Sequence, residues 1–252
     1  MTMSTDRSNT CPECGSQQVK KKGHIHPGKQ NHHCKDCGRQ FSADAARRVI
    51  DEEPRRWVER FLCETISLPG SCRTIGVSIR WLMDFMVACF AAGPEHLHVQ
   101  PVAASGEGRL GCLEVEADEL WSFVRKKATP YWVWIAMDKQ PRQILAFHVG
   151  ERSQDRAKER WAKIPAGYRE RAVCYTDHYA AYTGVIPAAQ HKAITKSARK
   201  TNHIERFNNT LRQRVSRLVR STLAFSKKME NHIGAIRYFI SHYNLTRAAL
   251  LV

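Results

Sequence analysis

The side chains best suited to chemistry in this sequence are carboxylates, because the chain around them is strongly basic. It has 252 residues, with 40 Lys and Arg against 24 Asp and Glu, and a formal net charge of +16. One short stretch nevertheless contains Glu114, Glu116, Asp118 and Glu119. Alternation along a strand places Glu114, Glu116 and Asp118 on one face. A solvated strand face explains the alternation but not the local reversal of charge, whereas Mg²⁺ prefers such oxygen ligands.

Two further acids occur at positions typical of a site. Asp177 follows the apolar run 172–176, which predicts a short strand, and sites in α/β folds gather at the carboxyl ends of strands. A turn or helix-capping aspartate is the ordinary alternative. Glu205 lies in the first turn of a helix predicted over 202–220, within a stretch rich in Lys and Arg. Its alternative is a capping box with Asn202, in which Glu205 serves only the helix terminus.

Carboxylates from two strand regions and one helix can hold two divalent cations about 3.5–4 Å apart. Such a pair activates a water or a 3′-hydroxyl and stabilises the leaving 3′-oxygen, so no covalent nucleophile is required. The polar and cationic side chains around Glu205 suit contacts with DNA phosphates. Together with one exposed position upstream, the candidate DNA-binding residues are Arg80, Arg206, Asn209, Arg212, Arg214 and Arg217.

A second group suited to chemistry is formed by cysteines. The pairs Cys11-x-x-Cys14 and Cys34-x-x-Cys37 have the spacing of a structural Zn²⁺ site with four thiolates. The stretch around them has few apolar residues, so a bound metal would supply the folding free energy that it lacks. Two unrelated pairs are the alternative. Because four thiolates complete such a site, a solvated or phosphate-contacting role is expected for His24, His26, His32 and His33.

Between the cysteines and the acidic stretch the sequence has helical character. A first helix is expected over 55–66, and Leu68-Pro69-Gly70 is expected to end it. The segment 71–75, the turn Gly76-Val77-Ser78 and a second helix over 79–90 fit a helix-turn-helix DNA-binding module, with Ser78 as the N-cap. An ordinary helical hairpin has the same local pattern.

The helices and strands predicted around these carboxylates define the fold class. Three strands, a helix, a strand and two further helices predict an α/β domain. These elements are expected at 113–124, 131–137, 143–149, 153–163, 172–176, 202–220 and 227–243, with a hairpin turn at 138–142.

The composition bounds the rest of the architecture. Nine cysteines, an odd number, argue against a disulfide framework. No apolar run of about 18 residues predicts a membrane span, and the N-terminus lacks the apolar segment of a signal peptide. We therefore expect no membrane partner and a cytoplasmic, nucleoid-associated protein. The predicted division is a zinc ribbon at 1–44, a helix-turn-helix module at 45–92, a linker at 93–111 and a catalytic domain at 112–252.

Several of these segments resemble known motifs. The sequence resembles the insertion-sequence-one family of bacterial DDE transposases in its order of modules and in four segments. These are EADELWSFV at 116–124, YTD at 175–177, NHIERFNNTLRQR at 202–214 and LAFSKK at 223–228.

The resemblance implies an RNase H-like catalytic domain, a mixed sheet flanked by helices, with Asp118, Asp177 and Glu205 as the metal-binding and catalytic triad. It implies Mg²⁺ (or Mn²⁺) as cofactor, beside the structural Zn²⁺. The implied reaction is hydrolysis of the phosphodiester at the element ends, followed by joining of the 3′-hydroxyl to target DNA. The implied partners are double-stranded terminal inverted repeats, target DNA and further copies of the chain, as a homo-oligomer on DNA.

Two other functions remain open. A DNA-binding regulator without catalysis would use the cysteine-rich head and the helix-turn-helix candidate alone. Another RNase H-like nuclease would use the same carboxylates. Short inverted repeats and a target duplication around the coding region would favour transposition over a nuclease.

Overall fold

The computed structural model describes residues 10–25, 28–42, 50–93, 96–100, 113–195, 198, 200–218 and 226–249. The chain divides into two compact units, the first ending at Asp51 and the second beginning at Glu52. Each unit has its own β-sheet, with strand order β1-β2-β3 in the first and β6-β5-β4-β7-β8 in the second. The predicted boundary at residue 44 and most of the predicted linker lie outside the described residues.

The first unit contains a small antiparallel sheet. Its strands are β1 (Val19–His24), β2 (Gln30–Cys34) and β3 (Gln40–Ser42). His32 is buried in this unit, and its ring stacks on Phe41 with 5.6 Å between centroids. The expectation of a solvated His32 is therefore wrong, because the residue supplies part of a very small core. His26 lies outside the described residues.

The second unit begins with three helices, which are α1 (Glu52–Phe61), α2 (Leu68–Ile75) and α3 (Ile79–Ala92). The first helix ends before Leu68-Pro69-Gly70, as predicted, but these three residues are not a loop, because they form the first turn of α2. Ser67 Oγ accepts a hydrogen bond from the Gly70 N–H at 3.1 Å, and a proline is tolerated in a first turn. The predicted turn is confirmed, since Gly76 ends α2 at a φ of 74° and Ser78 Oγ accepts from the Trp81 N–H at 3.2 Å.

Helix α3 is apolar on two sides. Leu82, Met86 and Phe90 are buried. Ile79, Met83 and Val87 are exposed along the same helix, Met83 to 52%. Within the described residues no single helix is long and apolar enough to cross a membrane; α2 and α3 meet that criterion only when joined across a bend of 107°.

The larger sheet is mixed. Strands β4 (Glu114–Phe123), β5 (Pro130–Asp138) and β6 (Ile144–Gly150) form an antiparallel meander. The predicted hairpin between β5 and β6 is confirmed. Strand β7 (Val173–Thr176) pairs in parallel with β4, and β8 (His191–Ala193) pairs in parallel with β7. The parallel pairing places the end of β7 level with the middle of β4, where the acidic residues lie.

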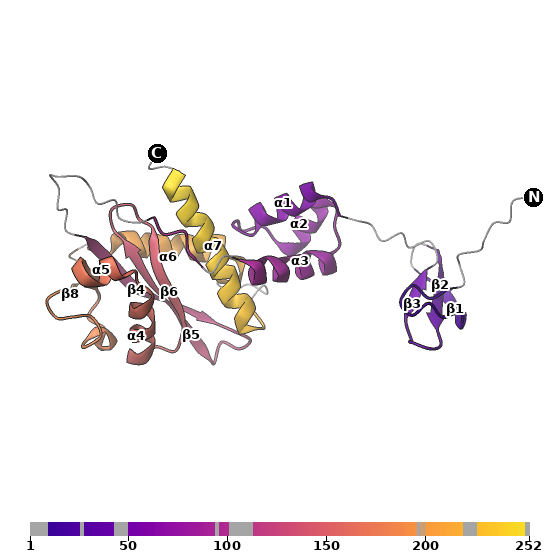
Figure 1. Cartoon of the computed structure of the whole chain (residues 1–252), viewed down its shortest axis with the longest axis horizontal. Coiled ribbons are helices and arrows are strands. Elements are labelled where there is room, and N and C mark those ends of the chain that lie inside the picture. Colours follow the sequence, from indigo (N-terminus) through magenta and orange to yellow (C-terminus); the bar gives the residue numbers. More distant parts are fainter. Residues whose placement is uncertain are drawn as a thin grey trace, which may run out of the picture. The chain divides into compact units, whose positions relative to one another are not determined.

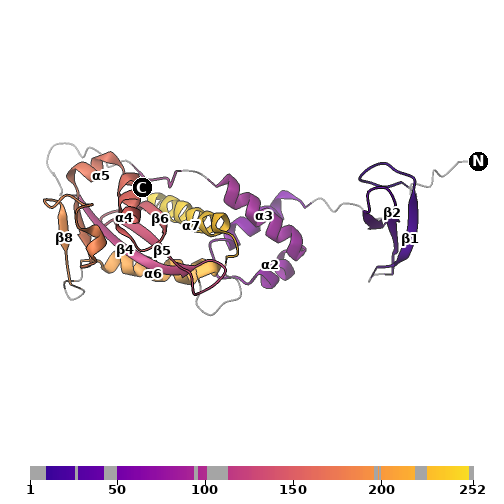
Figure 2. The same cartoon turned by 90° about the horizontal axis from the view of Figure 1, so that it is seen from below.

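Helices cover both faces of this sheet (Figures 1 and 2). On one side lie α6 (Asn202–Arg214) and α7 (Met229–Ala249); on the other lie α4 (Gln154–Lys163), α5 (Ala166–Arg171) and the 3₁₀ turn η2 (Ala180–Tyr182). A mixed five-stranded sheet flanked by helices fits an RNase H-like fold. Helix α6 ends at Arg214 and the 3₁₀ turn η4 (Ser216–Leu218) follows, so the predicted continuation to residue 220 is wrong.

Strand β4 alternates between the two sides as predicted. Leu120 belongs to the core formed with α6 and α7, whereas Val115 and Ala117 belong to the core formed with α4 and α5. Glu116 and Asp118 lie four and two residues before Leu120, so they are on the same face of the strand and are turned toward α6.

Helices α1–α3 share a core with α6 and α7. Val58, Leu82 and Phe90 lie in one apolar cluster with Leu211 and Phe239. Helix α3 lies against α7 in both views (Figures 1 and 2). The approach is close at Gly234 of α7, where an added Cβ would lie 2.7 Å from the Cβ of Phe90. Glycine is required there because any side chain would push the helices apart.

We predict that Gly234→Ala lowers the free energy of unfolding by about 1–3 kcal/mol, because overpacking at this contact outweighs the better helix propensity of alanine. Chemical denaturation of the full chain measures this. Gly167→Ala in α5 is the control, because its Cβ would meet only the end of the Arg171 side chain at 3.4 Å. Equal stability of the two variants would contradict the close approach.

A buried histidine joins α7 to the sheet. His232 Nε2 lies 3.1 Å from Ser122 Oγ on β4, and its Nδ1 lies 3.2 Å from Ser226 Oγ. Burial lowers the pKa of His232 to about 4, and the positive charge of Arg217 adds to this effect. The neutral ring is therefore the form that the fold accommodates.

We predict that stability falls as the pH is lowered from about 6.5 towards 4. In this window the unfolded chain binds a proton at residue 232 and the folded chain does not. The free energy of unfolding should therefore fall by an amount on the order of 3 kcal/mol. Unfolding midpoints measured across this range test it. His232→Gln should flatten the dependence, and an unchanged slope in that variant would exclude His232 as its source.

Candidate active site

Two acidic residues from different strands meet in the larger unit. Asp118 lies on β4, and Asp177 directly follows β7, whose Tyr175 is in register with Glu116. The carboxylate oxygens of Asp118, Glu119 and Asp177 lie within 4.8 Å of one another. The parallel β4–β7 pairing therefore brings together two acids that are distant in sequence, and the group is compatible with a divalent metal.

Asp118 is held in a partly buried environment. Its Oδ2 accepts a hydrogen bond from Asn208 Nδ2 of α6 at 2.8 Å. Burial raises the pKa of Asp118, and the negative charges of Asp177 and Glu205 raise it further. A cation between these groups would relieve the repulsion, so the donor chemistry fits a metal such as Mg²⁺.

Glu205 approaches the same site from α6. It is exposed, and its charge acts on both Asp118 and Glu116. Its Oε1 accepts a hydrogen bond from Thr201 Oγ1 at 3.0 Å. The alternative of a capping box with Asn202 is not formed, because α6 begins at Asn202 and Thr201 is its N-cap. Glu205 does not belong to the group whose oxygens lie within 4.8 Å.

Glu119 is a site residue that the sequence analysis left without a role. Its side chain is only 1% exposed and points to the α4 side of β4. Tyr182 Oη donates a hydrogen bond to it, and Arg152 Nη2 lies 3.0 Å from its Oε2. Arg152 is itself stacked over the Tyr179 ring at 3.9 Å. No local signal identifies Glu119, because its partners come from other elements.

Glu116 also lies on the α6 side, next to Asp118 on the same face. It is 1% exposed, and its Oε2 accepts a hydrogen bond from the Ile204 N–H at 2.8 Å. Burial raises the pKa of Glu116, and the N–H groups of Ile204 and His203 oppose that shift. Strand β4 thus carries buried carboxylates on both faces.

The candidate DNA-binding residues differ in their surroundings. Arg80, Arg206 and Asn209 are exposed, and Arg212 is half-buried. Arg214 donates from Nε to the Cys63 carbonyl at 2.9 Å and pairs with Glu64. The Arg217 guanidinium lies over the Phe90 ring at 5.4 Å, and burial lowers its pKa.

Arg214 and Arg217 therefore link the segment from α6 to η4 with α1–α3. Their positions give them structural contacts, and DNA binding by any of the six residues stays a prediction.

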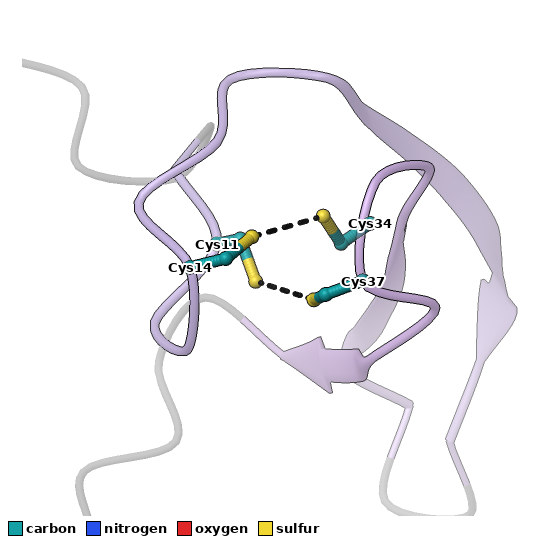
Figure 3. A group of neighbouring side chains, drawn as sticks. All are labelled: Cys11, Cys14, Cys34 and Cys37. Carbon is teal, nitrogen blue, oxygen red and sulfur yellow. Dashed lines mark hydrogen bonds between the residues drawn. The ribbon is translucent and has the colours of Figure 1, made fainter.

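The four cysteines of the first unit converge (Figure 3). Cys11 and Cys14 come from the loop before β1, and Cys34 and Cys37 flank the turn after β2. Cys11 Sγ lies 3.5 Å from Cys37 Sγ, and Cys14 Sγ lies 3.6 Å from Cys34 Sγ. A tetrahedral zinc with Zn–S bonds near 2.3 Å requires sulfur separations of about 3.8 Å. The cluster is therefore compatible with zinc.

Two tight turns build this cluster. Gly15 and Gly38 have φ angles of 69° and 75°, and their N–H groups donate to the Cys11 and Cys34 carbonyls at 3.0 and 3.1 Å. The N–H groups of Cys37 and Asp36 lower the pKa of Cys34 to about 6, which favours the thiolate at that residue. At Cys14 and Cys37 backbone N–H groups also act to lower the pKa, but burial and the neighbouring thiols outweigh them and raise it. Thiolate is the form that binds zinc.

Comparison with known proteins identifies the class. A family model described as IS1 transposase matches residues 111–245. The InsB protein of insertion element iso-IS1n from Shigella dysenteriae is 34% identical over 128 residues, which cover 51% of this chain and 94% of that protein. InsB of IS1 from Shigella flexneri is 35% identical over 130 residues, covering 51% and 95%. InsB of insertion element IS1 9 from Escherichia coli K12 is 32% identical over 180 residues, covering 70% and 99%.

These matches define a transposase, an enzyme that acts on DNA. More specifically, the chain belongs to the IS1 transposase family. The matched region contains Asp118, Asp177 and Glu205, whereas the cysteine cluster and α1–α3 precede it. A simian T-cell lymphotropic virus intasome in complex with PP2A regulatory subunit B56 gamma aligns over 72% of this chain and 66% of its own. Its identity of 13% and TM-score of 0.38 are too low to define a fold.

We predict that the purified chain holds one Zn²⁺ and that Cys34→Ser loses it. Because the small core cannot hold the first unit together without metal, amide protection in residues 10–42 should disappear in that variant. Elemental analysis and hydrogen exchange measure the two effects. Cys72→Ser, at a half-buried cysteine of α2, should change neither. Unchanged protection of residues 10–42 after zinc chelation would contradict a structural metal.

Proposed function

We propose that this transposase cleaves the phosphodiester at the ends of its element and joins the freed 3′-hydroxyl to target DNA, with Asp118, Asp177 and Glu205 as the metal-binding catalytic residues. The observation that carries this proposal is the convergence on Asp118: an oxygen of Asp177 lies within 4.8 Å of one of its carboxylate oxygens, and the negative charges of Asp177 and Glu205 both act on it although they come from distant parts of the chain. A regulator without catalysis has no use for this costly arrangement of like charges.

The chain's own residues have distinct tasks in this mechanism. Asp118 and Asp177 bind from two neighbouring strands, and Glu205 binds from the first turn of α6. Asn208 orients the Asp118 carboxylate through its 2.8 Å hydrogen bond. Two divalent cations, Mg²⁺ or Mn²⁺, when bound there would activate the attacking oxygen and stabilise the leaving 3′-oxygen. The exposed Arg206 and Asn209 lie one and four residues beyond Glu205 and would hold the DNA backbone against the site.

The N-terminal part would supply recognition of the double-stranded terminal inverted repeats. We assign this role to a zinc ribbon built on the four cysteines and to a helix-turn-helix formed by α2 and α3, with Arg80 exposed at the start of α3. Arg212, Arg214 and Arg217, at the end of α6 and in η4, would add positive charge for contacts with DNA phosphates. Bringing two element ends and a target together calls for more than one subunit, so we propose a homo-oligomer on DNA, acting at the nucleoid in the cytoplasm.

We predict that the full chain cleaves and joins DNA carrying the element's ends in the presence of Mg²⁺. Asp118→Asn, Asp177→Asn and Glu205→Gln should each lower the rate by about a thousandfold, because each removes a negative ligand worth several kcal/mol. Gel assays of strand cleavage and strand transfer measure the rate, and mobility shifts measure binding of the end DNA.

Binding of the end DNA should persist in all three variants, which separates loss of chemistry from loss of recognition. Glu170→Gln is the matched control, since Glu170 is an exposed acid of α5. Full activity in Asp118→Asn or Glu205→Gln would remove that residue from the triad. If Glu119→Gln abolished activity while Glu205→Gln did not, the third ligand would be Glu119.

A further inference from the structure

Glu116 contacts the N-terminus of α6 from the face of β4 that is turned toward this helix. Its carboxylate is 1% exposed, and its Oε2 accepts the Ile204 N–H at 2.8 Å. Ile204 lies in the first turn of α6, whereas Glu116 lies near the start of β4. The contact therefore joins two elements that are far apart in the sequence.

Helix α6 depends on this contact for one of its free N–H groups. The first N–H groups of a helix have no intrahelical partner and are usually satisfied by the N-cap side chain. The N-cap Thr201 makes no such bond, since its hydroxyl donates to the Glu205 carboxylate instead. Glu116 supplies an acceptor in its place, and its negative charge complements the positive end of the helix dipole.

The contact fixes the two proposed ligand positions relative to each other. Asp118 lies two residues after Glu116 on the same face of β4, and Glu205 directly follows Ile204. One hydrogen bond thus sets the distance between a strand that carries one ligand and a helix that carries another. Asn208, one turn further along α6, makes the second contact, to Asp118 itself.

Stability alone does not account for a carboxylate at this position. Glu116 Oε1 is buried and has no hydrogen-bond partner among the described residues. An unpartnered buried acceptor costs about 1–3 kcal/mol, so a neutral side chain would suit the core better. A residue retained at such a cost is a candidate for a functional role.

We propose that Glu116 is a positioning residue of the catalytic site, which tethers the first turn of α6 to β4 and so holds Glu205 at the distance from Asp118 that a divalent cation requires. The proposal rests on the assignment of Asp118 and Glu205 as metal ligands. Glu116 acts through the backbone of Ile204 and is not itself counted among the ligands.

Hydrogen exchange of the full chain tests the tether without relying on activity. In Glu116→Ala the amides of residues 203–207 should exchange at least about tenfold faster, because α6 loses its acceptor. Glu116→Gln should keep most of the protection, since its amide oxygen still accepts the Ile204 N–H. Glu114→Gln is the control on the same strand face; Glu114 pairs with Lys139 at 2.6 Å and should leave these amides unchanged.

Calorimetric titration with Mn²⁺ alone tests the consequence for the site. Glu116→Ala should weaken Mn²⁺ binding about tenfold or more, with Glu116→Gln near the unaltered chain, while the thermal midpoint reports any general loss of fold. If Glu116→Ala caused only a general loss of stability, its thermal midpoint would fall while its Mn²⁺ affinity stayed equal to that of Glu116→Gln.

Unchanged exchange at residues 203–207 in Glu116→Ala, or faster exchange with unchanged Mn²⁺ affinity, would overturn the proposal. Failure of the unaltered chain to cut DNA while it binds Mn²⁺ would reject the proposed reaction and leave the role of Glu116 intact. Failure of the unaltered chain to bind Mn²⁺ at all would overturn both.

Discussion

Strand β4 carries buried carboxylates on both of its faces, and the rest of the domain must supply hydrogen-bond donors that compensate their negative charge. Like charges repel strongly where water is excluded, so each acid needs its own compensation. On the α6 side it comes from a backbone N–H and a carboxamide, and on the α4 side from a guanidinium and a phenol. These donors belong to Ile204, Asn208, Arg152 and Tyr182. Helix α6 on one face, and the segment before α4 and the turn η2 on the other, are thereby bound to one strand.

Local patterns were enough to predict most of the larger sheet. Strands β4, β5, β6 and β7, helix α4 and the β5–β6 hairpin follow from periodicity and from the turn at 138–142, all of which act over short distances. The same holds for the cysteine cluster, where the spacing within each pair requires a tight turn and Gly15 and Gly38 supply it. Asp118 and Asp177 were expected at one metal site from their residue type and from the family resemblance, but the parallel pairing of β7 with β4 that brings them together was not predicted.

The features that the sequence did not predict depend on contacts between distant elements. Glu119 has no role that its own neighbours reveal, since Arg152 and Tyr182 reach it from α4's side of the sheet. Helix α6 ends at Arg214, although helical periodicity continues, and there Arg214 bonds to the Cys63 carbonyl. Small elements such as α5 and β8 were missed because they are too short to show a period. Leu68-Pro69-Gly70 was misjudged because Ser67 caps the helix that begins there.

The absence of a side chain at Gly234 lets α3 and α7 pack closely, so the helices before the sheet and the helices on the sheet share one hydrophobic core. If α3 grips the duplex and Asp118 belongs to the catalytic site, as we propose, the duplex would present its strands to Asp118 at a fixed rotational phase. Each base pair inserted between the gripped sequence and the bond to be cut turns that bond by roughly 34° around the duplex axis, given about 10.5 base pairs per turn. The spacing between recognised sequence and cleavage point would therefore be tolerated in steps of whole helical turns.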